Sequence, residues 1–283
     1  MATTSRTTII AVTNHKGGVG KTSTCINLAT AFARRGLTVL VCDLDGQANA
    51  SLVIGKLHPS KVQVTIREVL LSGTPEVLTE AIHTDTNLEG VHLIYGSIRL
   101  LKIENDLRAR VRPAEVLADK IKYLNDIYDI ILIDCPPALN LLTHNALAAS
   151  DYYLIPQPTG DQFGLYGMED LIGTVSDIKA ANPKLKLLGV LMMQHDNRKL
   201  VCKTMADTLR SKYSPVFEQT ISHSTGVQQA NMLKTSVIDL DRNNKVAKEY
   251  SKLSKEIISM IGLNDLNQIS NEDDEDEEEA HSS

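Results

Sequence analysis

The ten residues from His15 to Thr24 constrain this chain more than any other segment, because they follow the pattern of a phosphate-binding loop. The usual pattern is G-x-x-x-x-G-K-[ST], and the chain matches its end with Gly20-Lys21-Thr22. An apolar, β-branched run from Thr7 to Val12 precedes the loop, and a helical pattern from Thr22 to Arg35 follows it. A strand, a glycine loop and a helix N-terminus together direct backbone N–H groups at one point, which suits a polyphosphate.

The loop departs from the usual pattern at its start, where His15 replaces the first glycine and Lys16 adds a second lysine. Phosphate-loop chemistry assigns Lys21 to the β- and γ-phosphates and the hydroxyl of Thr22 to Mg²⁺, but it gives Lys16 no role. Ser23 and the amides of residues 18 to 23 are expected to bind the remaining phosphate oxygens. The expected nucleotide-binding residues are Lys16, Gly17, Gly18, Val19, Gly20, Lys21, Thr22 and Ser23.

Two acidic segments stand at the ends of strands predicted downstream of the loop. Thr38 to Cys42 predicts a buried strand followed by Asp43-Leu44-Asp45, and Tyr128 to Asp134 predicts an apolar strand that ends in an acid. Ligands of open α/β sheets bind at the carboxyl ends of the strands, so carboxylates placed there are candidates for the same site. Asp134 is expected to hold Mg²⁺ through a water molecule.

The segment Lys16-Gly-Gly-Val-Gly-Lys21-Thr22 resembles the deviant Walker A motif of the ParA/MinD family of ATPases, and the similarity covers roughly residues 7 to 262. The resemblance implies that ATP and Mg²⁺ are cofactors, that two subunits close on two ATP molecules, and that Lys16 reaches the partner subunit's ATP. It also implies that Asp45 positions or activates the attacking water, and that Asp43 supports the magnesium shell and Lys16. The family usually reads Asp-x-Asp-Pro-Gln, whereas this chain carries Gly46, which is expected to loosen the segment and alter turnover.

Alternating strand and helix patterns predict an α/β fold of the P-loop NTPase type, with a mostly parallel twisted sheet and helices on both faces. We expect one ATPase domain over residues 1–263 and an acidic disordered tail over residues 264–283. Only the region from about 57 to 112 departs from regular alternation. It predicts helices at Ile66 to Leu71, Glu76 to Ile82 and Ile98 to Val111, and a strand near Val91 to Tyr95. Farther along, the patterns predict a strand over 187–193 and a helix over 243–263. The resemblance implies a helix over 140–151, a strand over 152–156 and a helix start at 163–168.

The net charge of −6 hides an uneven distribution of acids and bases. Residues 272–279 hold eight acids, and without them 27 acids face 29 bases, so the remaining body carries a charge of +2. This tail either only solubilises the chain or competes with DNA or a partner for the basic surface. The four cysteines include no C-x-x-C pair and no run approaches 18 apolar residues, so a cytoplasmic protein with reduced thiols is expected.

Apolar residues recur every three or four positions between Asn243 and Leu263, which predicts an amphipathic helix. A stripe of lysines on its other side is either a solvated face or part of a surface that follows DNA phosphates without reading sequence. The candidate DNA-binding residues are Arg198, Lys199, Lys203, Lys245, Lys248, Lys252 and Lys255. Resemblance to ParA favours DNA, because Arg198 stands where relatives carry a DNA-contacting arginine. The segment from Ile221 to Val227, however, lacks the proline and arginines that relatives often carry there.

The resemblance favours a partition ATPase that dimerises with ATP, binds nonspecific DNA and segregates plasmid or chromosomal DNA on the nucleoid. A centromere-binding or cargo adaptor protein is expected to stimulate its weak ATPase activity. Two alternatives stay open. One is a positioning ATPase for a protein cargo, which uses the same cycle, and the other is a MinD-like cell-division regulator on a membrane. We expect no membrane binding, because the acidic tail would be repelled by anionic lipid.

Overall fold

The fold is built around one seven-stranded sheet, seen in a computed structural model that describes residues 6–72, 74–161 and 164–263. The strand order is β3-β4-β2-β5-β1-β6-β7, and every neighbouring pair is parallel except the short pair of β3 and β4. The strands are β1 (Thr8–Val12), β2 (Val39–Asp43), β3 (Ile82–His83), β4 (Val91–Ile94), β5 (Ile130–Asp134), β6 (Tyr152–Pro158) and β7 (Lys186–Met193). This order sets the carboxyl ends of β2, β5 and β1 side by side, where the two acidic segments and the loop begin.

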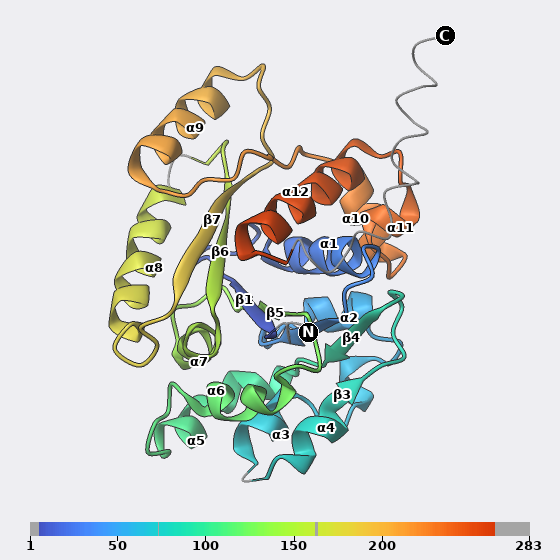
Figure 1. The fold of residues 1–283 in the computed structure, drawn as a ribbon, viewed down its shortest axis with the longest axis vertical. Helices are drawn as coiled ribbons and strands as arrows, with labels where there is room; N and C mark the ends of the chain where they lie inside the picture. The colour runs from blue at the N-terminus through green and yellow to red at the C-terminus, as the bar shows by residue number, and fades with distance from the viewer. Residues whose placement is uncertain (1–5, 73, 162–163, 264–283) are drawn as a thin grey trace, which may run out of the picture.

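Helices cover both faces of the sheet, as Figure 1 shows with α1 and α12 on one side of the strands and α7 and α8 on the other. The first face carries α1 (Lys21–Ala33), α2 (Asn49–Ile54), α10 (Thr225–Met232), α11 (Val237–Leu240) and α12 (Lys245–Ile261). The second face carries α3 (Ile66–Leu71), α4 (Glu76–Ala81), α5 (Glu104–Arg108), α6 (Val116–Ile121), α7 (Leu141–Ala149), α8 (Gly164–Ile178) and α9 (Leu200–Lys212).

The central strands are apolar at nearly every position because both of their faces are buried. In β1, Ile9 and Ala11 pack into the core on one side of the sheet, while Ile10 and Val12 pack into the core on the other. Side chains alternate between faces along a strand, so a run without polar residues is what a doubly covered parallel sheet requires. The predicted α/β P-loop fold is confirmed.

The predicted amphipathic helix near the end of the described chain is α12, and its two stripes lie as expected. The apolar stripe packs against α1 and the sheet, and its residues Val246, Tyr250, Leu253 and Ile257 are at most 1% exposed. Burial of side chains of this size contributes about 1.5–3 kcal/mol each, which fixes the helix to the domain. The four lysines of the other stripe are exposed.

One predicted helix is wrong. Instead of a single helix from Ile98 to Val111, the chain forms a 3₁₀ helix over Ile98–Lys102 and the short helix α5. Leu100, Ile103 and Leu107 are buried at a spacing of three and then four, so the segment changes from a 3₁₀ to an α turn to keep all three inside. Pro113 restricts the backbone of the residue before it and disfavours continuation of the helix.

Other boundaries differ by a few residues, and some elements were not predicted. The helix expected to end at Ile82 ends at Ala81, because Ile82 begins the antiparallel edge strand β3. The helices α2, α6, α9, α10 and α11 were not predicted. Residue 163 of the helix start expected at 163–168, and the whole acidic tail expected over 264–283, lie outside the described residues. Among the described helices, none is long and apolar enough to span a bilayer.

Candidate nucleotide site

The phosphate loop lies between β1 and α1 and depends on glycine at two positions. Gly18 and Gly20 have φ angles of +74° and +99°, in the left-handed region that side-chain-bearing residues rarely adopt. A Cβ at Gly20 would also lie 2.7 Å from Cε of Met193 at the end of β7. Gly20 is the N-cap of α1 and provides no side-chain cap, so the first N–H groups of the helix are available to an anion.

Lys21 lies inside the loop and is only 6% exposed. Its ammonium group donates hydrogen bonds to the carbonyl oxygens of Lys16, at 2.8 Å, and Asn14, at 3.2 Å. Burial lowers the pKa of Lys21, and the nearby Asp134 carboxylate opposes that shift. The loop carbonyl oxygens therefore hold the ammonium group at the centre of the loop. There its positive charge can interact with a bound phosphate.

Thr22 and Asp134 form the pair that fits a magnesium ion. The Thr22 hydroxyl donates a hydrogen bond of 2.7 Å to Oδ2 of Asp134 at the end of β5. The other oxygen, Oδ1, is buried and has no hydrogen-bond partner in the described part of the chain. A hydroxyl beside a carboxylate with one unused oxygen is a hard oxygen donor set of the kind that holds Mg²⁺, directly or through water.

Asp134 stands next to Asp43 across the sheet, since the two residues are register partners on β5 and β2. Both are fully buried. Burial raises the pKa of Asp134 well above its ordinary value, and the Asp43 charge raises it further, while the Thr22 hydrogen bond and Lys21 lower it. Burial likewise raises the pKa of Asp43 to about 6. A cation bound between these two adjacent buried carboxylates and a polyphosphate would offset their charge.

Asp43 and Asp45 differ in what their side chains contact. Asp43 accepts hydrogen bonds from the backbone N–H of Asp45, at 3.1 Å, and from the backbone and hydroxyl of Ser51, at 2.8 and 2.7 Å. Asp45 is 9% exposed, accepts a hydrogen bond from Gln47 and lines the cleft above the phosphate loop. The water-activating role of Asp45 fits this position and stays a prediction, as does a role for Asp43 near magnesium.

Gly46 is approached closely by the 3₁₀ helix Ile98–Lys102. A Cβ at Gly46 would lie 2.7 Å from Cδ2 of Leu101, so the proline usual in the family does not fit unless Leu101 moves. The Leu101 side chain is 63% exposed and can turn away.

Lys16 points away from the cleft that its neighbour Lys21 lines. Its ammonium group forms an ion pair with Asp161, which follows β6, and its side chain is 47% exposed. His15 beside it lies 3.4 Å from a carboxylate oxygen of Asp170 on α8. Lys16 does not line its own subunit's cleft, and neither does the buried Val19, whereas the other predicted loop residues do.

The cleft has a volume of about 630 Å³, which is large enough for a nucleotide. Several residues that line this cleft were not predicted from the sequence. Some follow the predicted site closely in sequence and could have been found there, but α10 lies about two hundred residues away and gave no signal. The missed lining residues are Gln47, Asn49, Leu52, Val53, Pro137, Asn231 and Met232.

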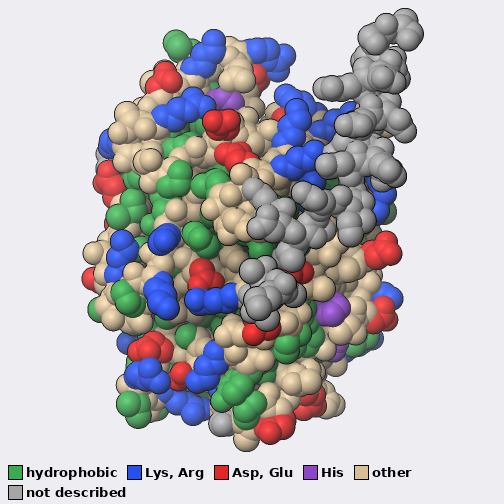
Figure 2. Space-filling view, viewed as in Figure 1, with side chains coloured by type: hydrophobic (Ala, Val, Ile, Leu, Met, Phe, Trp, Pro, Cys, Tyr) green, Lys and Arg blue, Asp and Glu red, His purple; other side chains and the backbone are tan. Residues whose placement is uncertain are grey.

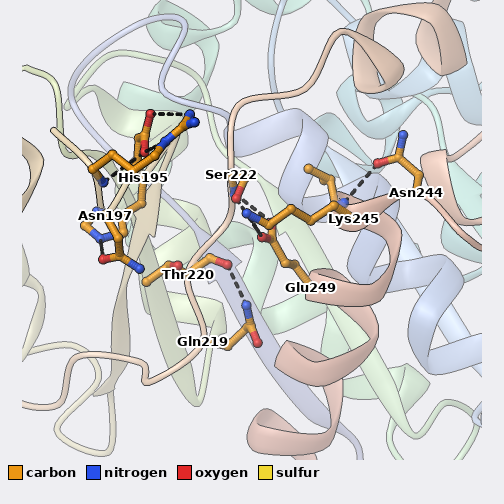
Figure 3. A network of polar contacts seen from close by, with 11 residues as sticks. His195, Asn197, Gln219, Thr220, Ser222, Asn244, Lys245 and Glu249 are labelled. Carbon is orange, nitrogen blue, oxygen red and sulfur yellow. Dashed lines mark hydrogen bonds and ion pairs between the residues drawn. The ribbon is translucent and has the colours of Figure 1, made fainter. Parts of the chain in front are cut away.

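The predicted DNA-binding residues lie at the starts of α9 and α12 and along α12. Figure 3 shows the segment Gln219 to Ser222 between the loop that carries His195 and the first turn of α12. In Figure 2, Lys and Arg side chains gather over α9 and over α12 on one face, with acidic side chains between them. Basic side chains over α9 and over α12 therefore share one face of the molecule (Figure 2).

Arg198 and Lys245 are among the basic residues that lie beside acidic side chains. Arg198 donates hydrogen bonds of 3.0 and 3.1 Å to Asp196, and these hold the pKa of Asp196 below its ordinary value. Lys245 lies 3.7 Å from Glu249, a buried carboxylate that also accepts hydrogen bonds from Ser222 (Figure 3). Both basic side chains stay exposed, so a phosphate could approach them from solvent.

Comparison with known proteins identifies the family. A family described as "AAA domain" matches residues 7–187. The chromosome partitioning protein ParA of Caulobacter vibrioides is 33% identical over 255 residues, which cover 89% of this chain and 94% of that protein. The sporulation initiation inhibitor protein Soj of Bacillus subtilis is 32% identical over 251 residues, or 88% of this chain and 97% of that protein.

Solved structures show the same fold. Cobyrinic acid a,c-diamide synthase from Mycobacterium smegmatis, with bound ADP and magnesium, superposes with a TM-score of 0.78 at 28% identity, over 90% of this chain and 96% of that chain. The septum site-determining protein MinD of Pyrococcus horikoshii, complexed with Mg-ADP, superposes with a TM-score of 0.71 at 24% identity. The match covers 91% of this chain and 98% of that chain. The phosphate loop, the paired carboxylates and the similarity over most of the chain together show that this protein belongs to the ParA/MinD family of P-loop ATPases.

Proposed function

We propose that this protein is a partition ATPase that hydrolyses ATP in a dimer and uses the cycle to segregate plasmid or chromosomal DNA. ATP and Mg²⁺ are its cofactors. Thr22 and Asp134 would hold the ion, which supplies charge neutralisation for the β- and γ-phosphates. Lys21 binds the phosphates of its own subunit, and Asp45 orients the attacking water.

The opposite placement of the two loop lysines carries this proposal. Lys21 is buried in its own cleft, whereas Lys16 is outside the cleft and half exposed. A half-exposed lysine beside the loop can contact a nucleotide bound by another molecule, so we infer that a second subunit completes the site. Such a group in trans makes dimerisation a condition of hydrolysis. The Lys16 contact with Asp161 must break when the partner arrives.

The ATP-bound dimer is proposed to bind DNA without sequence preference through the starts of α9 and α12. Exposed lysines neutralise backbone phosphates and release counterions, so the affinity should fall with salt. Two helix N-termini at this face add partial positive charge. A partner protein bound to the DNA cargo then stimulates hydrolysis and releases the dimer, which acts in the cytoplasm on the nucleoid.

Binding to random-sequence duplex DNA tests the proposal. Fluorescence anisotropy is measured with ATP, with ADP and without nucleotide between 50 and 300 mM salt. We expect tight, salt-sensitive binding with ATP only, and a shallower salt dependence, by about two units of slope, when Lys248 and Lys252 are both replaced by alanine. Lys184→Ala, an exposed lysine beside the start of β7, is the control.

Absence of salt-sensitive DNA binding by the ATP form would remove the partition proposal. Retention of DNA-free ATPase activity would then favour the positioning ATPase for a protein cargo. Flotation with anionic liposomes separates both from a MinD-like regulator, since only that function requires the ATP form to rise with the lipid.

A further inference from the structure

Ser51 is a fully buried polar residue in the first turn of α2, directly after the segment that carries Asp45. Its hydroxyl donates a hydrogen bond of 2.7 Å to Oδ2 of Asp43, and its backbone N–H donates to the same oxygen at 2.8 Å. The hydroxyl also accepts a hydrogen bond of 2.8 Å from the backbone N–H of Gly96, which follows β4. Ser51 therefore joins α2 to the ends of two strands.

Both ends of the segment from Asp45 to Ser51 are hydrogen-bonded to the carboxylate of Asp43. The backbone N–H of Asp45 donates to Oδ1 of Asp43, while Ser51 donates to Oδ2. Between these ends the chain turns tightly, with the Ala48 N–H donating to the Asp45 carbonyl and Ala48 itself at a φ of +53°. The orientation of the Asp43 carboxylate therefore sets where Asp45 lies in the cleft.

The Ser51 hydroxyl also keeps the backbone of Gly96 in place against Asp43. A Cβ at Gly96 would lie 2.8 Å from Cγ and 2.9 Å from Oδ1 of Asp43, so this backbone lies directly against the carboxylate. Without the hydroxyl, the Gly96 N–H loses its acceptor in a buried site and the carboxylate loses a donor. The carboxylate would then be free to turn toward the Gly96 N–H, which pulls Oδ1 away from Asp45.

We propose that Ser51 is a positioning residue for ATP hydrolysis, which orients Asp43 and through it the segment that carries Asp45. This inference rests on the proposed ATPase function and deepens it. Ser51 does not line the nucleotide cleft. Its removal should therefore slow the chemical step while nucleotide binding, which depends on the phosphate loop, stays largely unchanged.

The test compares Ser51→Ala with wild type for ATP affinity, single-turnover phosphate release and thermal unfolding. We expect phosphate release to slow by about 10- to 100-fold, as for the loss of one hydrogen bond to a charged group, with ATP affinity within about threefold. Ser51→Thr keeps the hydroxyl and should restore most of the rate.

Ser254→Ala is the matched control. Ser254 is also fully buried, and its hydroxyl also donates one hydrogen bond, to the Ser251 carbonyl, and accepts one, from Arg35. It lies on α12, away from the nucleotide cleft. This variant should lose comparable stability but keep the wild-type rate of phosphate release.

Three results would overturn the inference: a wild-type rate in Ser51→Ala, an equal loss of rate in Ser254→Ala, or a folded Ser51→Thr as slow as the alanine variant. If Ser51→Ala does not fold, Ser51→Cys carries the test, because a thiol has a similar shape but donates weakly. A slower rate in Ser51→Cys supports the inference and a wild-type rate refutes it. If wild type itself releases no phosphate, the proposed ATPase function fails instead, whatever Ser51 does.

Discussion

Replacing Asp134 by asparagine should stabilise the nucleotide-free protein, although Asp134 belongs to the site. An asparagine can place its carbonyl oxygen where Oδ2 accepts the Thr22 hydroxyl, and its NH₂ group where Oδ1 has no partner among the described residues. The substitution therefore removes a buried charge and keeps the Thr22 hydrogen bond. It also removes the repulsion from Asp43, the register partner of Asp134 on the neighbouring strand.

The size of the effect follows from Asp43, whose pKa rises from 3.8 to about 6. One pKa unit corresponds to ~1.4 kcal/mol, so ionised Asp43 costs the fold about 3 kcal/mol above pH 6. Asp134 is equally buried, and its Oδ1 has no donor in the described chain. Replacing buried ionic groups by neutral ones of similar shape typically gains ~1–4 kcal/mol, so we expect Asp134→Asn to raise the Tm at pH 8 by roughly 2–16 °C.

The gain should depend on pH, with a sign that the raised pKa values fix. As pH rises, the unfolded chain loses these protons first, so the folded state binds more protons and its stability falls. For Asp43 that loss spans pH 3.8 to about 6, and for Asp134 it extends higher. The advantage of Asp134→Asn should therefore be large at pH 8 and shrink toward pH 5.

Differential scanning fluorimetry in EDTA, without nucleotide, at pH 5 and pH 8 measures this difference. Asp43→Asn is the control, because both carboxylate oxygens of Asp43 accept hydrogen bonds from backbone N–H groups. An NH₂ group in place of either oxygen would put a donor against the N–H of Asp45 or Ser51. It should gain little or lose stability. With ATP and Mg²⁺ the order should reverse, since wild type gains binding energy that Asp134→Asn lacks. An unchanged or lower Tm for a folded Asp134→Asn at pH 8 would refute the buried-charge reasoning.

Four further predictions concern the proposed cycle. Lys21→Ala should abolish ATP binding, measured by titration with a fluorescent nucleotide; unchanged affinity would contradict the phosphate-loop assignment. Lys16→Ala should bind ATP but lose at least about 10³-fold in hydrolysis rate, and a fully active monomer in light scattering would exclude the role in trans. Asp45→Ala should trap an ATP dimer on DNA, seen as slow release by surface plasmon resonance, whereas rapid release would count against Asp45. Deleting residues 272–283 should leave the DNA affinity equal or raise it, and a weaker affinity would contradict competition by the tail.

Short-range patterns were enough to predict the fold and the centre of the site. The strands β1, β2 and β5 are apolar at nearly every position because they are buried on both faces, and such runs are visible in any sequence. The loop from His15 to Thr24 is equally local, since the left-handed glycines and the helix start depend on neighbouring residues. The failed prediction for 98–111 was a case where packing, through the buried Ile103 and Leu107, overrode a charged helical pattern.

The sequence by itself determined that the chain folds as an α/β ATPase and which loop is the candidate for binding phosphate, because both follow from periodicity and local backbone geometry. Only the tertiary structure decided which distant groups meet at that loop. It placed Asp43 beside Asp134 through strand order, Asn231 and Met232 at the cleft through the packing of α10, and Ser51 between Asp43 and Gly96. Apart from the Asp43–Ser51 contact, which spans eight residues, these contacts join residues far apart in the chain, so no local pattern encodes them. The pairing of Asp43 with Asp134 sets the charge of the site, α10 forms part of its wall, and Ser51 orients the Asp43 carboxylate.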